Sequence, residues 1–103
     1  MNLNKLMKQA QKMQEKMAQA QADLAEKTVE VQAAGGKITV VANGAGDVIS
    51  IKVAKEIVDP EDVEFLEEAI LSGVQQAIEQ GKAIASSEMS KITGGMGVAG
   101  LGL

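Results

Sequence analysis

The sequence lacks the side chains on which most enzyme active sites depend: it has no cysteine, histidine, tryptophan or tyrosine, and all ten of its basic residues are lysines. Without cysteine there is no disulfide, no thiolate metal site and no thiol nucleophile, which fits a reducing cytoplasm. Acid–base and nucleophilic chemistry is left with carboxylates, lysines and hydroxyls. We therefore expect a protein that is not an enzyme and that uses no cofactor, no metal and no small-molecule substrate.

Aromatic residues and long apolar runs are also missing. Phe65 is the only aromatic residue, so there is no stacking platform for single-stranded nucleic acid. No run approaches the length of a membrane span, and residues 1–11 carry lysines instead of the apolar core of a signal peptide. The net charge of −4 argues against nucleic acid as a partner. The lysines are unevenly placed, however, because residues 1–22 contain four of them against one glutamate.

Residues 2–26 have the pattern of a long amphipathic helix. No glycine or proline interrupts them, and Ala, Gln, Lys, Met and Glu, all good helix formers, dominate. Apolar residues recur at alternating steps of three and four, the spacing of a heptad seam. This seam consists of Leu3, Leu6, Ala10, Met13, Met17, Ala20 and Leu24.

Four lysines of this helix fall within an arc of about 80°, roughly opposite the seam, when each residue turns by about 100°. This lysine arc consists of Lys5, Lys8, Lys12 and Lys16. One interpretation is a solvated face. The other is a phosphate-binding surface, because cations in the first turns oppose the helix dipole, whereas phosphates are attracted to both the lysines and the helix N-terminus.

Three β-rich runs follow, at residues 28–34, 37–43 and 48–54, and predict an antiparallel meander. Gly35-Gly36 supplies the first turn, and the Asn and glycines of residues 43–47 allow the positive φ of a tight hairpin. Alternation predicts one apolar face that another element must cover. That face contains Val29, Val31, Ala33, Ile38, Val40, Ala42, Ile49, Ile51 and Val53.

The second helix is predicted to start with Asp59 as its cap and Pro60 in its first turn, and to continue to residue 92. Small residues stand at every fourth place, at Ala69, Gly73, Ala77, Gly81 and Ala85. Glycine in a helix interior costs about 1 kcal/mol, so this row indicates either close backbone approach or simple tolerance, and leaves open a break near Gly81. We expect one α-β-β-β-α domain over residues 1–93 and a flexible Gly-rich tail over residues 94–103.

Taken together, the chain resembles the YbaB/EbfC family of bacterial nucleoid-associated proteins over nearly its full length. The resemblance is carried by residues 7–17 (MKQAQKMQEKM), the Asn43-Gly44 hairpin leading into Ile51-Lys52-Val53, the acidic start of the second helix, and residues 88–95 (EMSKITGG). It implies an α+β protomer with a long N-terminal helix, a three-stranded antiparallel meander and a long C-terminal helix. It also implies a tweezer-like homodimer, duplex DNA as partner, and a place in the cytoplasm at the nucleoid.

On this interpretation the lysine arc contacts DNA. Without arginine, which is best suited to bidentate phosphate or guanine contacts, we expect weak binding with little sequence specificity. The alternative is a protein-interaction module that binds partner helices along its seams. Phe65 points away from Val63, Leu66 and Ile70, which belong to the apolar stripe of its helix, so it either packs a dimer interface or covers the end of a strand.

Overall fold

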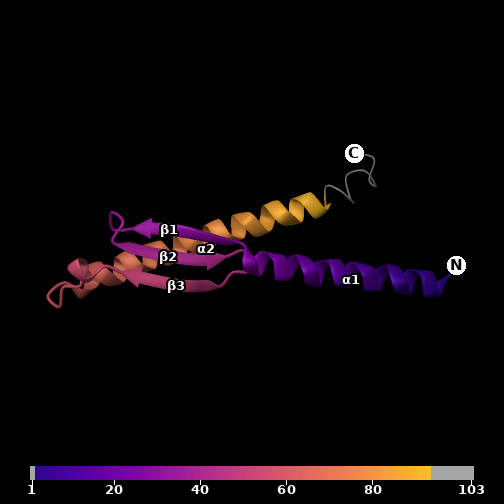
Figure 1. The fold of residues 1–103 in the computed structure, drawn as a ribbon, viewed down its shortest axis with the longest axis horizontal. Coiled ribbons are helices and arrows are strands. Elements are labelled where there is room, and N and C mark those ends of the chain that lie inside the picture. Colours follow the sequence, from indigo (N-terminus) through magenta and orange to yellow (C-terminus); the bar gives the residue numbers. More distant parts are fainter. Residues whose placement is uncertain (1, 94–103) are drawn as a thin grey trace.

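The computed structural model describes residues 2–93, and the predicted tail lies outside them. The elements follow in the order α1 (Leu3–Glu26), β1 (Thr28–Ala33), β2 (Ile38–Asn43), β3 (Val48–Val53), a 3₁₀ helix η1 (Lys55–Ile57) and α2 (Val63–Thr93). The strands form an antiparallel sheet in the order β1-β2-β3. The predicted α+β fold and its meander are therefore confirmed. The molecule is elongated, because α1 projects from one end of the sheet (Figure 1).

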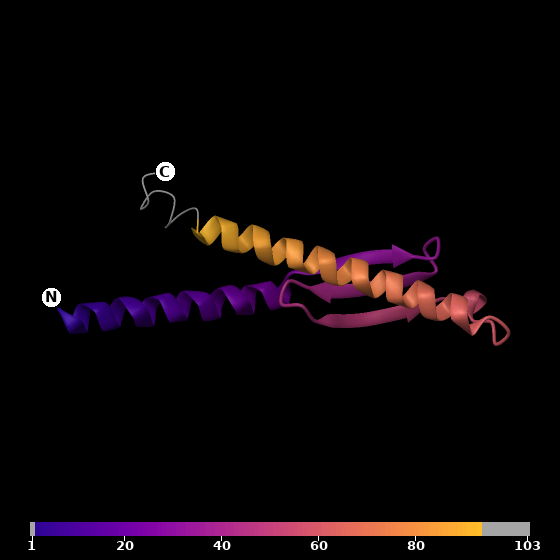
Figure 2. The same cartoon turned by 180° about the vertical axis from the view of Figure 1, so that it is seen from behind.

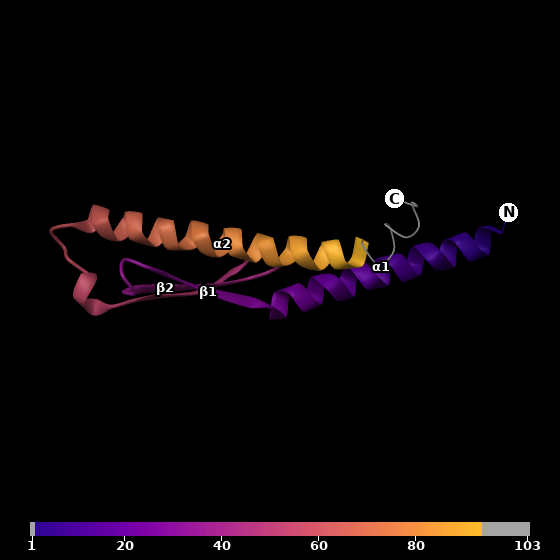
Figure 3. The same ribbon diagram turned by 90° about the horizontal axis from the view of Figure 1, so that it is seen from above.

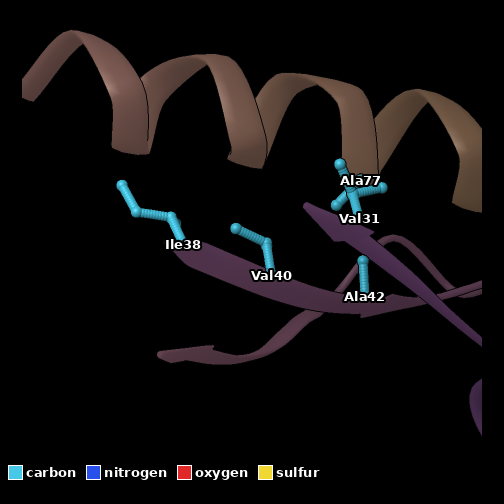
Figure 4. Close-up of a cluster of buried hydrophobic side chains, with 5 residues drawn as sticks. All are labelled: Val31, Ile38, Val40, Ala42 and Ala77. Carbon is cyan, nitrogen blue, oxygen red and sulfur yellow. The ribbon is translucent and has the colours of Figure 1, made fainter. Parts of the chain in front are cut away.

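The core lies between α2 and one face of the sheet (Figure 4). Val31 on β1, Ile38, Val40 and Ala42 on β2, and Ala77 on α2 form one buried cluster. The sheet residues of this cluster come from the face that the period-two alternation predicts. α2 is thus the predicted cover of the sheet, as the view along the layers shows (Figure 3).

The predicted burial of β3 is wrong for two of its three residues. Ile49 and Ile51 are 52% and 42% exposed, and only Val53 is partly buried against the core. α2 crosses β1 and β2 and makes few contacts with β3. The register between β2 and β3 also shifts between Val41 and Ala42, so the simple alternation is interrupted there.

The predicted start of the second helix is also wrong. α2 begins at Val63, and its cap is Asp62, whose Oδ1 accepts a hydrogen bond from the Phe65 amide at 3.3 Å. Asp59 instead closes a turn: its Oδ1 accepts from the Glu61 amide and its carbonyl from the Asp62 amide, both at 2.9 Å. An Asp-Pro pair favours this turn as well as a helix start, and a second aspartate follows that can act as the cap.

The glycines of α2 do not break the helix, which continues through Gly81 to its end. A Cβ built on Gly73 would stand 2.9 Å from Cγ2 of Val40, and one built on Gly81 would collide with the backbone carbonyl oxygen of Asn43. Close approach of α2 to the sheet, one of the two interpretations of the small-residue row, is therefore confirmed. Helix and strand lie so near each other that a methyl group does not fit between them.

The turn between β2 and β3 confirms the predicted positive φ for one glycine but not for Asn43. Among the described glycines, the one in this turn with positive φ is Gly46, at +94°, while Asn43 and Gly44 have ordinary backbone angles. Gly44 is required for space, because a Cβ there would stand 2.9 Å from Cδ2 of Leu24. In the β1–β2 turn, Ala34, Gly35 and Gly36 all have positive φ, in agreement with the predicted glycine turn.

Candidate nucleic-acid interface

α1 extends beyond the sheet with little support from the rest of the chain (Figure 2). Leu24, near its C-terminal end, is its only buried residue, and every residue from 3 to 19 is exposed. At the other end Asn2 caps the helix, since its side-chain oxygen accepts a hydrogen bond from the Lys5 amide at 3.2 Å. α1 is therefore a projecting arm whose N-terminal part, residues 3–19, is exposed on every side.

The lysine arc lies on this arm. Lys5, Lys8, Lys12 and Lys16 are all exposed, and none forms a salt bridge with another residue of the described range 2–93. The first turn of α1 contains no acid and its last turn no base. Asp23 and Glu26 stand near the C-terminus, where the helix dipole disfavours negative charge. The charges of α1 are thus arranged against the stability of the helix, which makes the interpretation as a plain solvated face less satisfactory.

Half of the acidic residues lie in one segment at the opposite end of the molecule. Seven of the 14 acids fall between Glu56 and Glu68, a range that contains no lysine. This segment lies at the end of the sheet remote from α1 (Figure 1). At physiological ionic strength charges are screened over about 8 Å, far less than the 71 Å length of the molecule. The acidic total therefore opposes anion binding at the arm much less than the net charge indicates.

The apolar seam of α1 is exposed beside the lysines. Leu6, Met13 and Met17 are each 47–48% exposed and Leu3 is 70% exposed. An apolar groove separates α1 from the end of α2 and is lined on α1 by Met13, Met17 and Ala20 together with Lys12 and Lys16, and on α2 by Met89. Lys12 and Lys16 therefore lie beside the seam at this groove, and the predicted position of the lysine arc opposite the seam is wrong for these two residues.

Two features of the junction between arm and sheet were not predicted from the sequence. Asn43 is 4% exposed and hydrogen-bonds to α1, although the sequence indicated only a turn residue. Lys27, just after α1, pairs with Glu88 on α2, and Lys91 lies 3.5 Å from the same carboxylate. The hydrogen bond from Lys27 is the main cause that lowers the pKa of Glu88 below its ordinary value of 4.5. Residues 61 apart in the sequence give no pattern from which such a pair could be found.

The described residues were also compared with the requirements of a metal site and of a membrane span. Within residues 2–93, no three acidic side chains gather closely enough to hold a metal ion, even in the acidic segment around Asp59. None of the helices in that range is long and apolar enough to cross a membrane.

The chain is thus a small α+β protein with a projecting helix that carries four exposed lysines. Comparison with known proteins identifies the class more closely. Residues 1–96 match the model of the YbaB/EbfC DNA-binding family. The chain belongs to this family, which is a family of DNA-binding proteins and not of enzymes, and the resemblance seen in the sequence is confirmed.

Relatives with high sequence identity support the assignment. A nucleoid-associated protein of Ruminiclostridium cellulolyticum is 53% identical over 96 residues, which are 93% of this chain and 84% of the relative. One of Alkaliphilus metalliredigens is 50% identical over 100 residues, 97% of this chain and 88% of that one. The crystal structure of an uncharacterised Helicobacter pylori protein, HP0035, shares the fold, with a TM-score of 0.63 at 15% identity over 76% of this chain and 90% of its own.

Proposed function

We propose that this protein binds duplex DNA as a homodimer, chiefly through phosphates and with little sequence specificity, and that it acts at the nucleoid in chromosome organisation or gene regulation. Membership of a DNA-binding family and the nucleoid-associated relatives support the partner and the location. The observation that carries the mechanism is the lysine arc, four exposed cations without salt-bridge partners in residues 2–93 on an arm remote from the acidic segment.

In this mechanism Lys5, Lys8, Lys12 and Lys16 contact phosphate oxygens. Lysine is a flexible point charge, and the chain contains no arginine that could form a bidentate contact with guanine. Phosphate contacts carry no base information, so affinity depends on salt far more than on sequence. The positive end of the α1 dipole adds a further attraction for phosphate near Lys5.

The homodimer is supported by apolar surface that the protomer leaves uncovered. The seam of α1 is exposed over most of its length, and β3 is an edge strand whose Ile49 and Ile51 are exposed. Exposed edges and contiguous apolar surface are features that proteins normally cover with a partner. Doubling the chain also doubles the number of lysine arcs available to one duplex.

A specific observation favours a second function, a protein-interaction module. Met13, Met17 and Met89 line the groove between α1 and the end of α2. Methionine-rich surfaces adapt readily to partner helices. In that case DNA binding would be negligible and the groove would hold a helix of another protein.

An electrophoretic shift assay with duplex DNA at low and moderate salt distinguishes the two functions. We expect the unmodified protein to bind, and we expect binding to be lost when all four lysines of the arc are replaced by glutamine. The matched control replaces Lys52 and Lys55, on and just after β3, by glutamine and should lose much less affinity. Retained affinity in the four-lysine variant contradicts the mechanism, and absence of binding by the unmodified protein favours the interaction module.

A further inference from the structure

We propose that the turn at Asn43-Gly44 sets the angle between α1 and α2, so that Asn43 and Gly81 are positioning residues for the lysine arc. The inference rests on the proposed function only where it concerns DNA; the geometry of the two helices is independent of it. The small-residue row indicated close packing at Gly81, but no sequence pattern linked Gly81 or Asn43 to the direction of α1.

The first step is that α1 is held only at one end. Leu24 is its single buried residue, and contacts with α2 and β2 are few. The direction of the arm is therefore determined where α1 meets the sheet and not by packing along its length. Any change of angle at that point is amplified toward the N-terminus.

The second step is that the turn binds the C-terminal carbonyls of α1. The Asn43 side-chain amide donates to the carbonyl oxygen of Ala25 at 3.2 Å, and the Gly44 amide donates to those of Leu24 at 3.0 Å and Lys27 at 2.9 Å. The last carbonyls of a helix have no partner within it. Here the turn supplies the partners, so the end of α1 is fixed to the sheet through oriented bonds.

The third step is that Asn43 also organises the turn itself. Its Oδ1 accepts hydrogen bonds from the amides of Ala45 at 3.0 Å and Asp47 at 2.9 Å. Asn43 is 4% exposed, and no buried side-chain nitrogen or oxygen in the described residues lacks a partner. An ionised aspartate has acceptors only, so in place of Asn43 it would keep the bonds from the turn and lose the donor to Ala25.

The fourth step is that α2 rests on the same turn. Gly81 packs against the carbonyl oxygen of Asn43 so closely that a methyl group would collide with it, and Ile84 packs over Gly44. Lys27, at the end of α1, forms a salt bridge with Glu88 one to two turns further along α2. Both helices thus contact the same turn at Asn43-Gly44, and the geometry of this turn determines the angle between them.

Leverage makes this angle important for binding. Lys5 lies 19 residues from Leu24, about 28 Å along a helix that rises 1.5 Å per residue, so a tilt of about 10° moves it by about 5 Å. Such a displacement exceeds the range of a hydrogen bond to phosphate. A correctly folded protein with a wrongly oriented arm would therefore bind DNA poorly.

The test measures the distance between α1 and α2 within one protomer. Because the chain contains no cysteine, spin labels can be attached at Gln11→Cys on α1 and Ser86→Cys on α2, both exposed and neither in the lysine arc. Labelled protein is mixed with an excess of unlabelled protein, so that distances within one protomer dominate the double electron–electron resonance signal. Asn43→Asp and Gly81→Ala are introduced separately, and circular dichroism reports whether each variant remains folded.

We expect both variants to shift the mean distance by about 3 Å or more, or to broaden its distribution, since Gln11 lies about 20 Å along the helix from Leu24. Ile38→Val, which removes a methyl group from the core away from the turn, is the control for lost stability and should leave the distribution unchanged. DNA affinity, measured in parallel, should fall several-fold in the two junction variants and not in the control.

A distance distribution like that of the unmodified protein in folded Asn43→Asp and Gly81→Ala overturns the inference, whatever the DNA result. If Asn43→Asp does not fold, Gly81→Ala decides alone, because it leaves every hydrogen bond of Asn43 chemically intact. Altered distances with unchanged DNA affinity overturn the positioning role. If the unmodified protein binds no DNA, the proposed function fails, while the distance measurement still decides whether the turn sets the angle.

Discussion

Gly81 of α2 packs directly against the backbone carbonyl of Asn43, with no room for a β-carbon between them. This contact brings a helix within reach of the turn that also holds the end of α1. It explains why a residue unfavourable in helices stands in the middle of a 31-residue helix.

Gly81→Ala should lower the free energy of unfolding even though alanine is the better helix former. Alanine gains about 1 kcal/mol of helix propensity, but forcing a methyl group into a close-packed contact costs about 1–3 kcal/mol. The net loss is measurable by urea denaturation. Gln80→Ala, at the neighbouring exposed position, should change stability by no more than about 0.5 kcal/mol. A stabilised Gly81→Ala protein would contradict the packing.

The pair between Lys27 and Glu88 should make stability depend on pH in the acid range. The pKa of Glu88 is lowered in the folded protein, so the pair stabilises the fold above pH 4.5 and its contribution is lost as the pH falls through the lowered pKa. Urea midpoints measured from pH 7 to pH 3 should therefore fall more for the unmodified protein than for Glu88→Gln. Glu79→Gln removes an exposed acid of α2 without a salt bridge in residues 2–93 and should retain the dependence of the unmodified protein.

The seam of α1 should be needed for dimerisation. Replacing Leu6 and Met13 by glutamine keeps the helix propensity of α1 but removes exposed apolar surface. We expect the dimer to lose at least about 1.4 kcal/mol of association free energy, which is a tenfold increase of its dissociation constant. Sedimentation measures this constant. Lys8→Gln, on the opposite side of the same helix, should leave the dimer intact. A folded monomer of the unmodified protein at micromolar concentration would show that the homodimer is wrong.

Phe65 should also contribute to an interface between protomers. It is 47% exposed and is not among the side chains that pack against the core, so the protomer gives it little cover. Phe65→Ala should weaken the dimer while circular dichroism of the helix stays the same. An unchanged dimer dissociation constant would contradict this role. The control is Leu71→Ala, which removes another exposed apolar side chain of α2. It shows whether the loss of any exposed apolar side chain from α2 weakens the dimer.

Salt should weaken DNA binding steeply. Each phosphate neutralised contributes about 0.9 to the slope of log K against log salt concentration, and the two lysine arcs of a dimer can neutralise at most about eight phosphates. Lys8→Gln should reduce the slope by up to about 1.8, because each protomer loses one contact. The slope is obtained from affinities at several salt concentrations. Nanomolar, site-specific binding that persists at high salt would contradict a phosphate-based mechanism.

The order and type of the elements could be predicted from the sequence because they depend on local patterns. The heptad spacing of α1, the alternation of Ile38, Val40 and Ala42, and the glycines before β2 act within a few residues of one another. The lysine arc followed from the same helical period. The start of α2 was missed because Asp59 and Asp62 can both act as caps, and only the turn geometry selects between them.

Other features depended on contacts between residues distant in the chain, and only the tertiary structure determined them. Ile49 and Ile51 are exposed because α2 crosses the other two strands, and Gly81 is required because Asn43 approaches it from the β2–β3 turn. The separation of the acidic segment from the lysine arc also arises only when the chain has folded. The physical reason is the same in each case: periodicity tells which side of an element is apolar, but the crossing of one element over another decides which part of that side is covered.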